Sequence, residues 1–168
     1  MINIDFNMIS NVIILSYLIY IAYKDYQKLI VTNTSLVYLI VIFIVRDVVL
    51  KINYLDILWA LLINLVIFVG LYILPKKCIG AGDVKLALVL ALWCNYPQCI
   101  LAIYISFITG GIVSIIYLLK LYLIKNMKLV NIYKYKVIPF APILIWGNVI
   151  AYYKANSIWQ FWCGLLGL

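Results

Sequence analysis

Long apolar runs alternate with short polar breaks along almost the whole of this chain. The runs fall near residues 6–23, 34–50, 55–75, 84–95, 98–119 and 137–153. Most approach the roughly 17–25 residues that a membrane-spanning helix needs, and a helix pairs its backbone polar groups internally while its apolar side chains face lipid. The pattern therefore predicts an all-α, polytopic membrane protein with about six transmembrane helices.

The fourth run and the C-terminal tail are both shorter than a spanning helix. The fourth run either ends at the break Asn95-Tyr96-Pro97 or continues across it into the fifth. The tail from Ser157 to Leu168 is apolar but too short to span, so we expect an interfacial or packed helix there. Because the sequence has no repeat or linker, residues 1–168 are expected to form a single transmembrane domain.

The composition favours a membrane and argues against a nucleic-acid partner. Hydrophobic residues make up 68% of the chain and charged residues 11%, whereas soluble domains are about 45–50% apolar. The formal charge of +8 would suit nucleic acid, but the basic residues are scattered between the apolar runs. We therefore expect the chain to have the lipid bilayer as a partner and to bind no nucleic acid.

The basic residues also predict the orientation of the chain. The N-terminus lacks the positive region of a cleavable signal peptide, so the first run is expected to remain as a helix with its N-terminus outside. Ten of the 13 basic residues then face the cytoplasm: Lys24, Lys28, Lys76, Lys77, Lys85, Lys120, Lys125, Lys128, Lys134 and Lys136. Arg46, Lys51 and Lys154 fall outside. This split follows the positive-inside rule for the cytoplasmic membrane.

Few side chains are available for acid–base chemistry. The chain has no histidine and no glutamate, and its five acids are Asp5, Asp25, Asp47, Asp56 and Asp83. Ser-His-Asp and Cys-His sites, Glu-dependent zinc proteases and histidine metal centres are thereby excluded, and we expect no metal and no other cofactor. The four cysteines, Cys78, Cys94, Cys99 and Cys163, form no C-x-x-C pair and are interpreted as small buried hydrophobes.

Asp83 follows Gly80-Ala81-Gly82, directly before the fourth run. Gly80 and Gly82 remove side chains where a substrate backbone could approach, and they permit backbone angles that other residues resist. This combination favours a site that accommodates a peptide. The alternative is that Asp83 is only an N-cap, with the glycines supplying the turn.

Asp25 ends the first run on the same predicted, cytoplasmic side as Asp83, while the other three acids fall on the opposite side. Its alternative role is an exposed i,i+3 pair with Lys28. Two carboxylates that converge in a partly desolvated site tend to share a proton. Near neutral pH one of them can act as base on a water molecule while its protonated partner donates to a scissile carbonyl, so peptides can be hydrolysed without histidine or metal.

Three motifs, in order along the chain, resemble those of type IV prepilin peptidases. Residues 80–85 are similar to the G-x-G-D-x-K motif, which in part is shared by presenilin-like proteases, and residues 138–142 to a late I-P-F-A-P motif. Asp25 and Asn33 have the spacing of D-x5-I-P-N, although residues 31–32 are Val-Thr where Ile-Pro is usual. The resemblance covers most of the chain.

This resemblance implies an aspartic endopeptidase in which Asp25 and Asp83 are catalytic, and Gly80, Gly82 and Lys85 bind substrate or shape the site. The implied substrate is a type IV pilin-like precursor, a prepilin or preflagellin, whose basic leader is cut after a glycine at the cytoplasmic membrane face. The chain is similar to the short Flp/Tad-type and archaeal preflagellin peptidases. Longer members carry an N-terminal segment with paired C-x-x-C motifs linked to methylation, so we expect no methyltransferase activity.

The other motif residues have structural interpretations. Lys85 lies roughly opposite Asp83 on a helix, where pairing with lipid headgroups is favoured over pairing with acidic substrate residues. Pro139 and Pro142 predict the start of a helix with a kink. The segment from Lys120 to Lys136 predicts a basic loop on the cytoplasmic membrane surface.

Two other classes of function stay open at this point. In a small transporter or channel, intramembrane aspartates would carry protons or bind cations, which requires acids near the middle of a span. In a noncatalytic pilus assembly factor, the fold would be retained and the aspartates would be dispensable.

Overall fold

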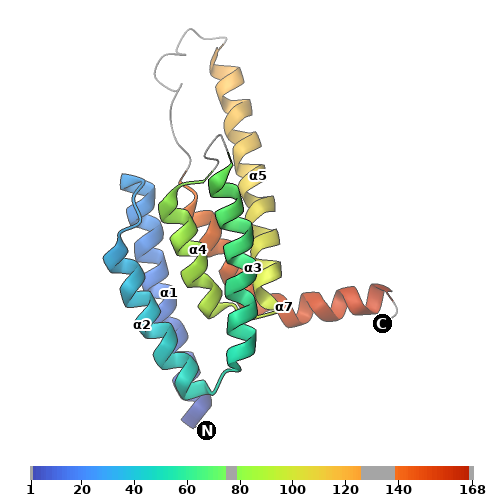
Figure 1. Ribbon diagram of the computed structural model, residues 1–168. Helices are drawn as coiled ribbons and strands as arrows, with labels where there is room; N and C mark the ends of the chain where they lie inside the picture. The colour runs from blue at the N-terminus through green and yellow to red at the C-terminus, as the bar shows by residue number, and fades with distance from the viewer. Residues whose placement is uncertain (1, 75–78, 126–138, 167–168) are drawn as a thin grey trace.

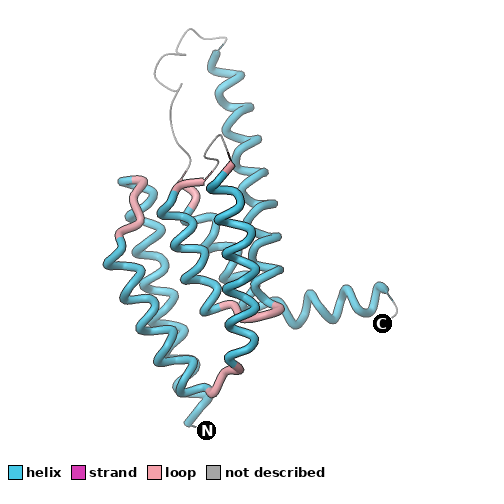
Figure 2. The backbone as a smooth tube through the Cα atoms, in the orientation of Figure 1, coloured by secondary structure: helices cyan, strands magenta, loops and turns pink. Residues whose placement is uncertain are grey.

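The computed structural model describes residues 2–74, 79–125 and 139–166. Within these ranges it contains helices and no strand, which confirms the predicted all-α fold with six helices (Figure 2). The helices are α1 (Ile2–Lys28), α2 (Asn33–Leu50), α3 (Tyr54–Ile73), α4 (Ala81–Trp93), α5 (Gln98–Lys125) and α7 (Ala141–Leu166).

Consecutive helices run up and down beside one another, as Figure 1 shows. Helices α1, α3 and α5 end at the upper end of the bundle in that view, where α2, α4 and α7 begin. We call this the aspartate end, because Asp25 lies in the last turns of α1 and Asp83 in the first turn of α4. The opposite end, with the N-terminus and residues 51–53 and 94–97, is called the N-terminal end.

Four helices in the described part of the chain are long and apolar enough to cross a membrane. They are Phe6–Lys28, Asn33–Leu50, Tyr54–Ile73 and Gln98–Lys120. With only 13 residues, α4 is shorter than these. It ends at Trp93 and α5 begins at Gln98, so the break between them separates two helices and the fourth apolar run does not continue across it.

Two helix boundaries differ from the predicted ones. α1 continues to Lys28 instead of ending near residue 23, because the polar residues at its end are compatible with a helix. α7 begins at Ala141 and continues to Leu166, so the tail after Ser157 is helical, as predicted, but belongs to the same helix as the last apolar run. Figure 1 shows the C-terminal part of α7 turning away from the bundle.

α4 is enclosed by other helices, since it packs against α2, α3 and α7. Seven of its 13 residues are buried: Val84, Leu86, Ala87, Val89, Leu90, Ala91 and Trp93. A helix that is apolar on all sides is stable where neighbouring helices surround it. The enclosure of α4 therefore fixes the position of Asp83 at its start.

Two of the four cysteines have described side chains. Cys94 and Cys99 are free and buried, as interpreted from the sequence. Cys78 and the side chain of Cys163 lie outside the described residues, as does most of the predicted basic loop before α7.

α5 and α7 approach closely through small residues. A Cβ atom at Gly147 would collide with the Ser106 hydroxyl and lie 2.9 Å from both the Ala102 carbonyl oxygen and the Ser106 amide nitrogen. Two of these three contacts are with backbone atoms, which cannot move without shifting α5. Small residues that let helix backbones approach in this way are typical of packing in membranes.

Replacing Gly147 with alanine is therefore expected to lower the free energy of unfolding by about 1–3 kcal/mol, because α5 and α7 must separate. Gly111→Ala is the matched control, since a Cβ atom there has open space and alanine is the better helix former. Unfolding of both variants can be followed by circular dichroism in mixed micelles with increasing SDS. Equal midpoints for Gly147→Ala and the wild type would contradict the close approach.

Candidate active site

Asp25 is a buried carboxylate that contacts the start of another helix. Only 4% of its surface is exposed, and its Oδ2 accepts a hydrogen bond of 3.3 Å from the backbone amide of Ala141. The alternative of an exposed pair with Lys28 is therefore wrong. The carboxylate instead lies at the N-terminus of α7, where free amides and the helix dipole favour an acceptor.

The local sequence explains why Ala141 donates to Asp25. The amides of Ile143 and Leu144 already donate to the carbonyl of Phe140 (3.1 and 3.0 Å), and Pro142 has no amide hydrogen. Ala141 is thus left with a donor that the helix itself does not pair. The late proline motif consequently starts α7 as predicted, and it also leaves one amide for the aspartate, a role that the sequence did not reveal.

Asp83 lies in the first turn of α4, where it is half-buried. The N-cap of this helix is Gly80, whose carbonyl accepts the amides of Asp83 (3.1 Å) and Val84 (3.2 Å). The interpretation of Asp83 as the N-cap is therefore wrong, although its carboxylate accepts a hydrogen bond from the backbone of the N-cap residue, Gly80. A Cβ atom at residue 80 would lie 3.2 Å from Asp83 Oδ2, so glycine leaves this oxygen uncrowded.

The two carboxylates influence each other. Burial and, to a smaller extent, the negative charge of Asp25 together raise the pKa of Asp83 to about 6, against the opposing effect of a hydrogen bond from the backbone of Gly80. Asp83 lies outside the four candidate spans. Its raised pKa means that the pair retains a proton to a higher pH than two isolated carboxylates would.

The connection between α1 and α2 holds the two aspartate-bearing helices together. Val31 packs against Gly82: a Cβ atom added at residue 82 would lie 3.5 Å from the Cβ of Val31. Lys85 is exposed, and its Nζ donates to Asn33 Oδ1 at 3.1 Å, a contact that the sequence did not predict. Thr32 accepts a hydrogen bond of 3.4 Å from Lys24. Val31 and Thr32, which depart from the usual motif, thus both make contacts here.

The site has no visible arrangement for a metal ion. Among the residues that the structure describes, no group of three histidine, cysteine, aspartate or glutamate side chains is placed to bind one. The chemistry that the described residues offer is that of two carboxylates near a free helix terminus.

Known proteins share this chain's central region. The model of the type IV leader peptidase family matches residues 12–115, which include Asp25 and Asp83. The prepilin leader peptidase/N-methyltransferase of Legionella pneumophila is similar, with 31% identity over 100 residues that cover 58% of this chain and 32% of that protein. The chain thus spans about a third of the length of this relative. No solved structure shows a significant match.

The electrostatic contact between the two aspartates can be tested by titration. In Asp25→Asn we expect the pKa of Asp83 to fall, because the charge that raises it is removed while its burial is unchanged. The carboxyl 13C shift of Asp83 in detergent micelles reports this pKa, and only five carboxylate side chains need assignment. Asp56→Asn, in the first turn of α3 at the other end, is the control. An unchanged pKa in Asp25→Asn would show that the carboxylates do not interact.

Proposed function

Because this chain belongs to the type IV leader peptidase family, we propose that it is a leader peptidase of the aspartic type, with Asp25 and Asp83 as its catalytic pair. The observation that carries the proposal is that a buried Asp25 and a half-buried Asp83 lie at the same end of the bundle, where the start of α4 packs against the segment that follows Asp25. The negative charge of Asp25 also raises the pKa of Asp83. Both residues lie within the matched region.

In the proposed reaction the pair shares one proton. The ionised carboxylate takes a proton from a water molecule, which attacks the scissile carbonyl, and the protonated carboxylate donates to the carbonyl oxygen. The first carboxyl then gives its proton to the amide nitrogen as the C–N bond breaks, and the other carboxylate recovers a proton from the tetrahedral intermediate as the new carboxyl group forms. The raised pKa of Asp83 supports a pair with one protonated and one ionised carboxyl group, because it keeps a proton in the site as the pH approaches neutrality. Gly80 assists by leaving space beside the carboxylate, and Gly82 by letting residue 31 approach.

The proposed substrate is a type IV pilin-like precursor, cleaved between a basic leader and an apolar helix that lies in the membrane. The name of the Legionella protein supports a prepilin as the substrate class. We propose that the aspartate end faces the cytoplasm, since the positive-inside rule assigns Lys24, Lys28 and Lys85 to that side. The proposal covers the peptidase activity and not the methylation in that protein's name.

The transporter alternative finds less support. It requires acids near the middle of a span, whereas Asp25 lies in the last turns of α1 and Asp83 in the first turn of α4. The assembly-factor alternative makes the opposite prediction for the aspartate variants, so one experiment separates it from a peptidase.

Asp25→Asn and Asp83→Asn are each expected to reduce precursor cleavage by about 10²–10⁴-fold, because an amide cannot transfer the required proton. The measurement is the size of a candidate precursor co-expressed with each variant. Asparagine at residue 25 retains an oxygen that can accept the Ala141 amide, so the fold is expected to survive.

Asp56→Asn is the control for these variants, because it removes a carboxylate at the N-terminal end and is expected to process the precursor normally. Processing at the wild-type rate in either catalytic-site variant would rule out the aspartic mechanism. Normal filament assembly in both would favour the assembly factor.

Lys85 is proposed to shape the site through Asn33. The Lys85→Met and Asn33→Ala variants should each reduce cleavage by a similar factor, and the double variant should be no slower than either single one, because all three lack the same 3.1 Å hydrogen bond. Initial cleavage rates in detergent or nanodiscs measure this coupling. Independent, multiplying effects would show that Lys85 acts on lipid or substrate instead.

A further inference from the structure

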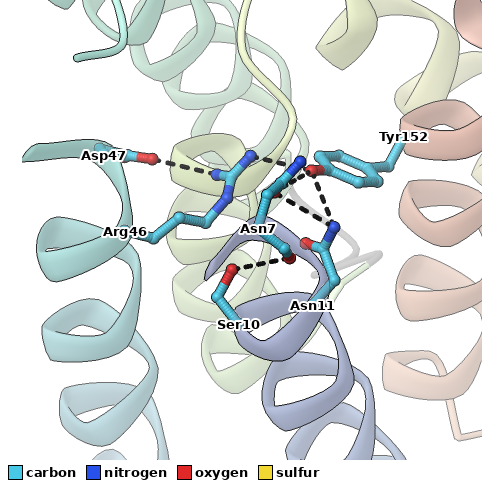
Figure 3. Close-up of polar contacts among 6 residues, drawn as sticks. All are labelled: Asn7, Ser10, Asn11, Arg46, Asp47 and Tyr152. Atoms are coloured by element: carbon cyan, nitrogen blue, oxygen red, sulfur yellow. Dashed lines mark hydrogen bonds and ion pairs between the residues drawn. The ribbon is translucent and has the colours of Figure 1, made fainter. Parts of the chain in front are cut away.

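A buried polar cluster lies at the N-terminal end of the bundle, far from the two aspartates (Figure 3). It consists of Asn7, Ser10, Asn11, Arg46, Asp47 and Tyr152. Arg46 and Asp47 are near this end, as their place in the second apolar run predicts, but both side chains are buried inside the bundle, with 4% and 5% of their surfaces exposed. Arg46 Nη1 and Asp47 Oδ1 form an ion pair of 3.0 Å.

Tyr152 connects this ion pair to the first helix. Its hydroxyl accepts hydrogen bonds from Arg46 Nη2 (3.1 Å) and Asn11 Nδ2 (3.2 Å), and it donates to Asn7 Oδ1 (3.4 Å). Its ring stacks on Trp93 with 4.7 Å between the centroids. One side chain of α7 thereby contacts α1, α2 and α4, and Figure 3 shows its hydrogen bonds to residues of α1 and α2.

Such a cluster is better suited to fixing an arrangement than to supplying stability. A buried ion pair often contributes little net stability, but it is directional and tolerates few geometries. The apolar contacts between helices are not directional and allow rotation more readily. Breaking the hydrogen bonds of Tyr152 would leave the buried Arg46 without one of its partners, so the cluster penalises any other rotation of α1 against α7.

Helices α1 and α7 also contact each other at the aspartate end. In the described part of the chain, hydrogen bonds between α1 and α7 occur at Tyr152 and at the bond from Ala141 to Asp25. Between these ends the buried stripe of α1 is apolar, with Ile14 and Leu18 fully buried. Directional contacts between the two helices are thus confined to their ends.

The spacing along each helix puts both contacts on one face. Asn7 and Asp25 are 18 residues apart, which is about five turns of 3.6 residues, and Ala141 and Tyr152 are 11 apart, which is about three turns. A rotation of α1 that breaks the contacts of Asn7 and Asn11 therefore turns Asp25 away from Ala141 as well.

We propose that the polar cluster is a positioning device, with Tyr152 as its central residue, that sets the rotation and register of α1 against α7 and thereby aims the Asp25 carboxylate into the site. The inference rests on the proposed peptidase function for its kinetic consequence, but the geometry of the aspartates can be measured without that activity.

Tyr152→Phe is the most direct test, because it removes the hydroxyl and keeps the ring that stacks on Trp93. Cleavage of a purified pilin-like precursor is expected to show a kcat lower by about ten- to a hundredfold and a KM within about twofold, since residue 152 lies at the opposite end of the bundle from the two aspartates. Tyr153→Phe is the matched control: it is the next residue and exposed, and it should behave like the wild type.

A second readout is the titration of Asp83 by its carboxyl 13C shift. If α1 rotates, the charge of Asp25 moves away and the pKa of Asp83 falls in Tyr152→Phe but not in Tyr153→Phe. This result supports the positioning role even if the Asp25→Asn variant still cleaves and the peptidase proposal fails. A folded Tyr152→Phe protein with an unchanged kcat and an unchanged Asp83 titration overturns the positioning role while leaving the peptidase proposal intact.

The double variant Arg46→Met/Asp47→Leu extends the test. Replacing a buried ion pair with apolar residues of similar size usually preserves folding, so this variant should fold and show the same loss of kcat and the same fall in the pKa of Asp83. If this variant and Tyr152→Phe both lose helix packing in detergent, the proposal is also overturned, because the cluster is then required for folding and not specifically for aiming Asp25.

Discussion

The hydrogen bond from the Ala141 amide to Asp25 joins the first helix to the last, and the site depends on it. A free amide at the start of a buried helix needs an acceptor, and the proline motif reduces the candidates in the first turn of α7 to Ala141 alone. A carboxylate from α1 meets this need. One contact thus completes the backbone pairing of α7 and holds a buried acid 116 residues away at the end of the bundle.

The second aspartate is held by different means. Asp83 lies in the first turn of a helix of 13 residues that packs against three others, so its position follows mainly from the packing of α4, and the hydrogen bond to its carboxylate comes from the same helix start. The glycine at residue 80 leaves that carboxylate uncrowded, while Val31 and Asn33 link the start of α4 to the segment that follows Asp25. The pair therefore combines a buried acid with one that has more open surroundings.

The sequence predicted those features that depend on apolar periodicity and local motifs. Six helices, the start of α7 at its prolines and the location of Asp83 at the start of the fourth helix all follow from such patterns. The Ala141 donor could not be predicted, because every residue except proline carries an amide and only tertiary contacts show which one is free. The burial of Arg46 with Asp47 was equally hidden, since charged residues near the end of a span usually face the interface. The end of α1 was misjudged because Lys24 and Asp25 look like a boundary in hydropathy but continue the helix.

The stripe of α1 that has polar residues at both ends and apolar residues between them restricts how this helix can vary in length. Removing one residue between Asn11 and Asp25 would turn one end by about 100° relative to the other and shorten the distance by about 1.5 Å. Adding seven residues would keep both polar ends on the same face of α1, but it would lengthen the helix by about 10 Å, a third of the thickness of the bilayer core. Apolar substitutions in this segment can therefore be tolerated, whereas insertions and deletions cannot. An insertion or deletion would break either the helical period that aligns the two polar ends or the match to the thickness of the membrane.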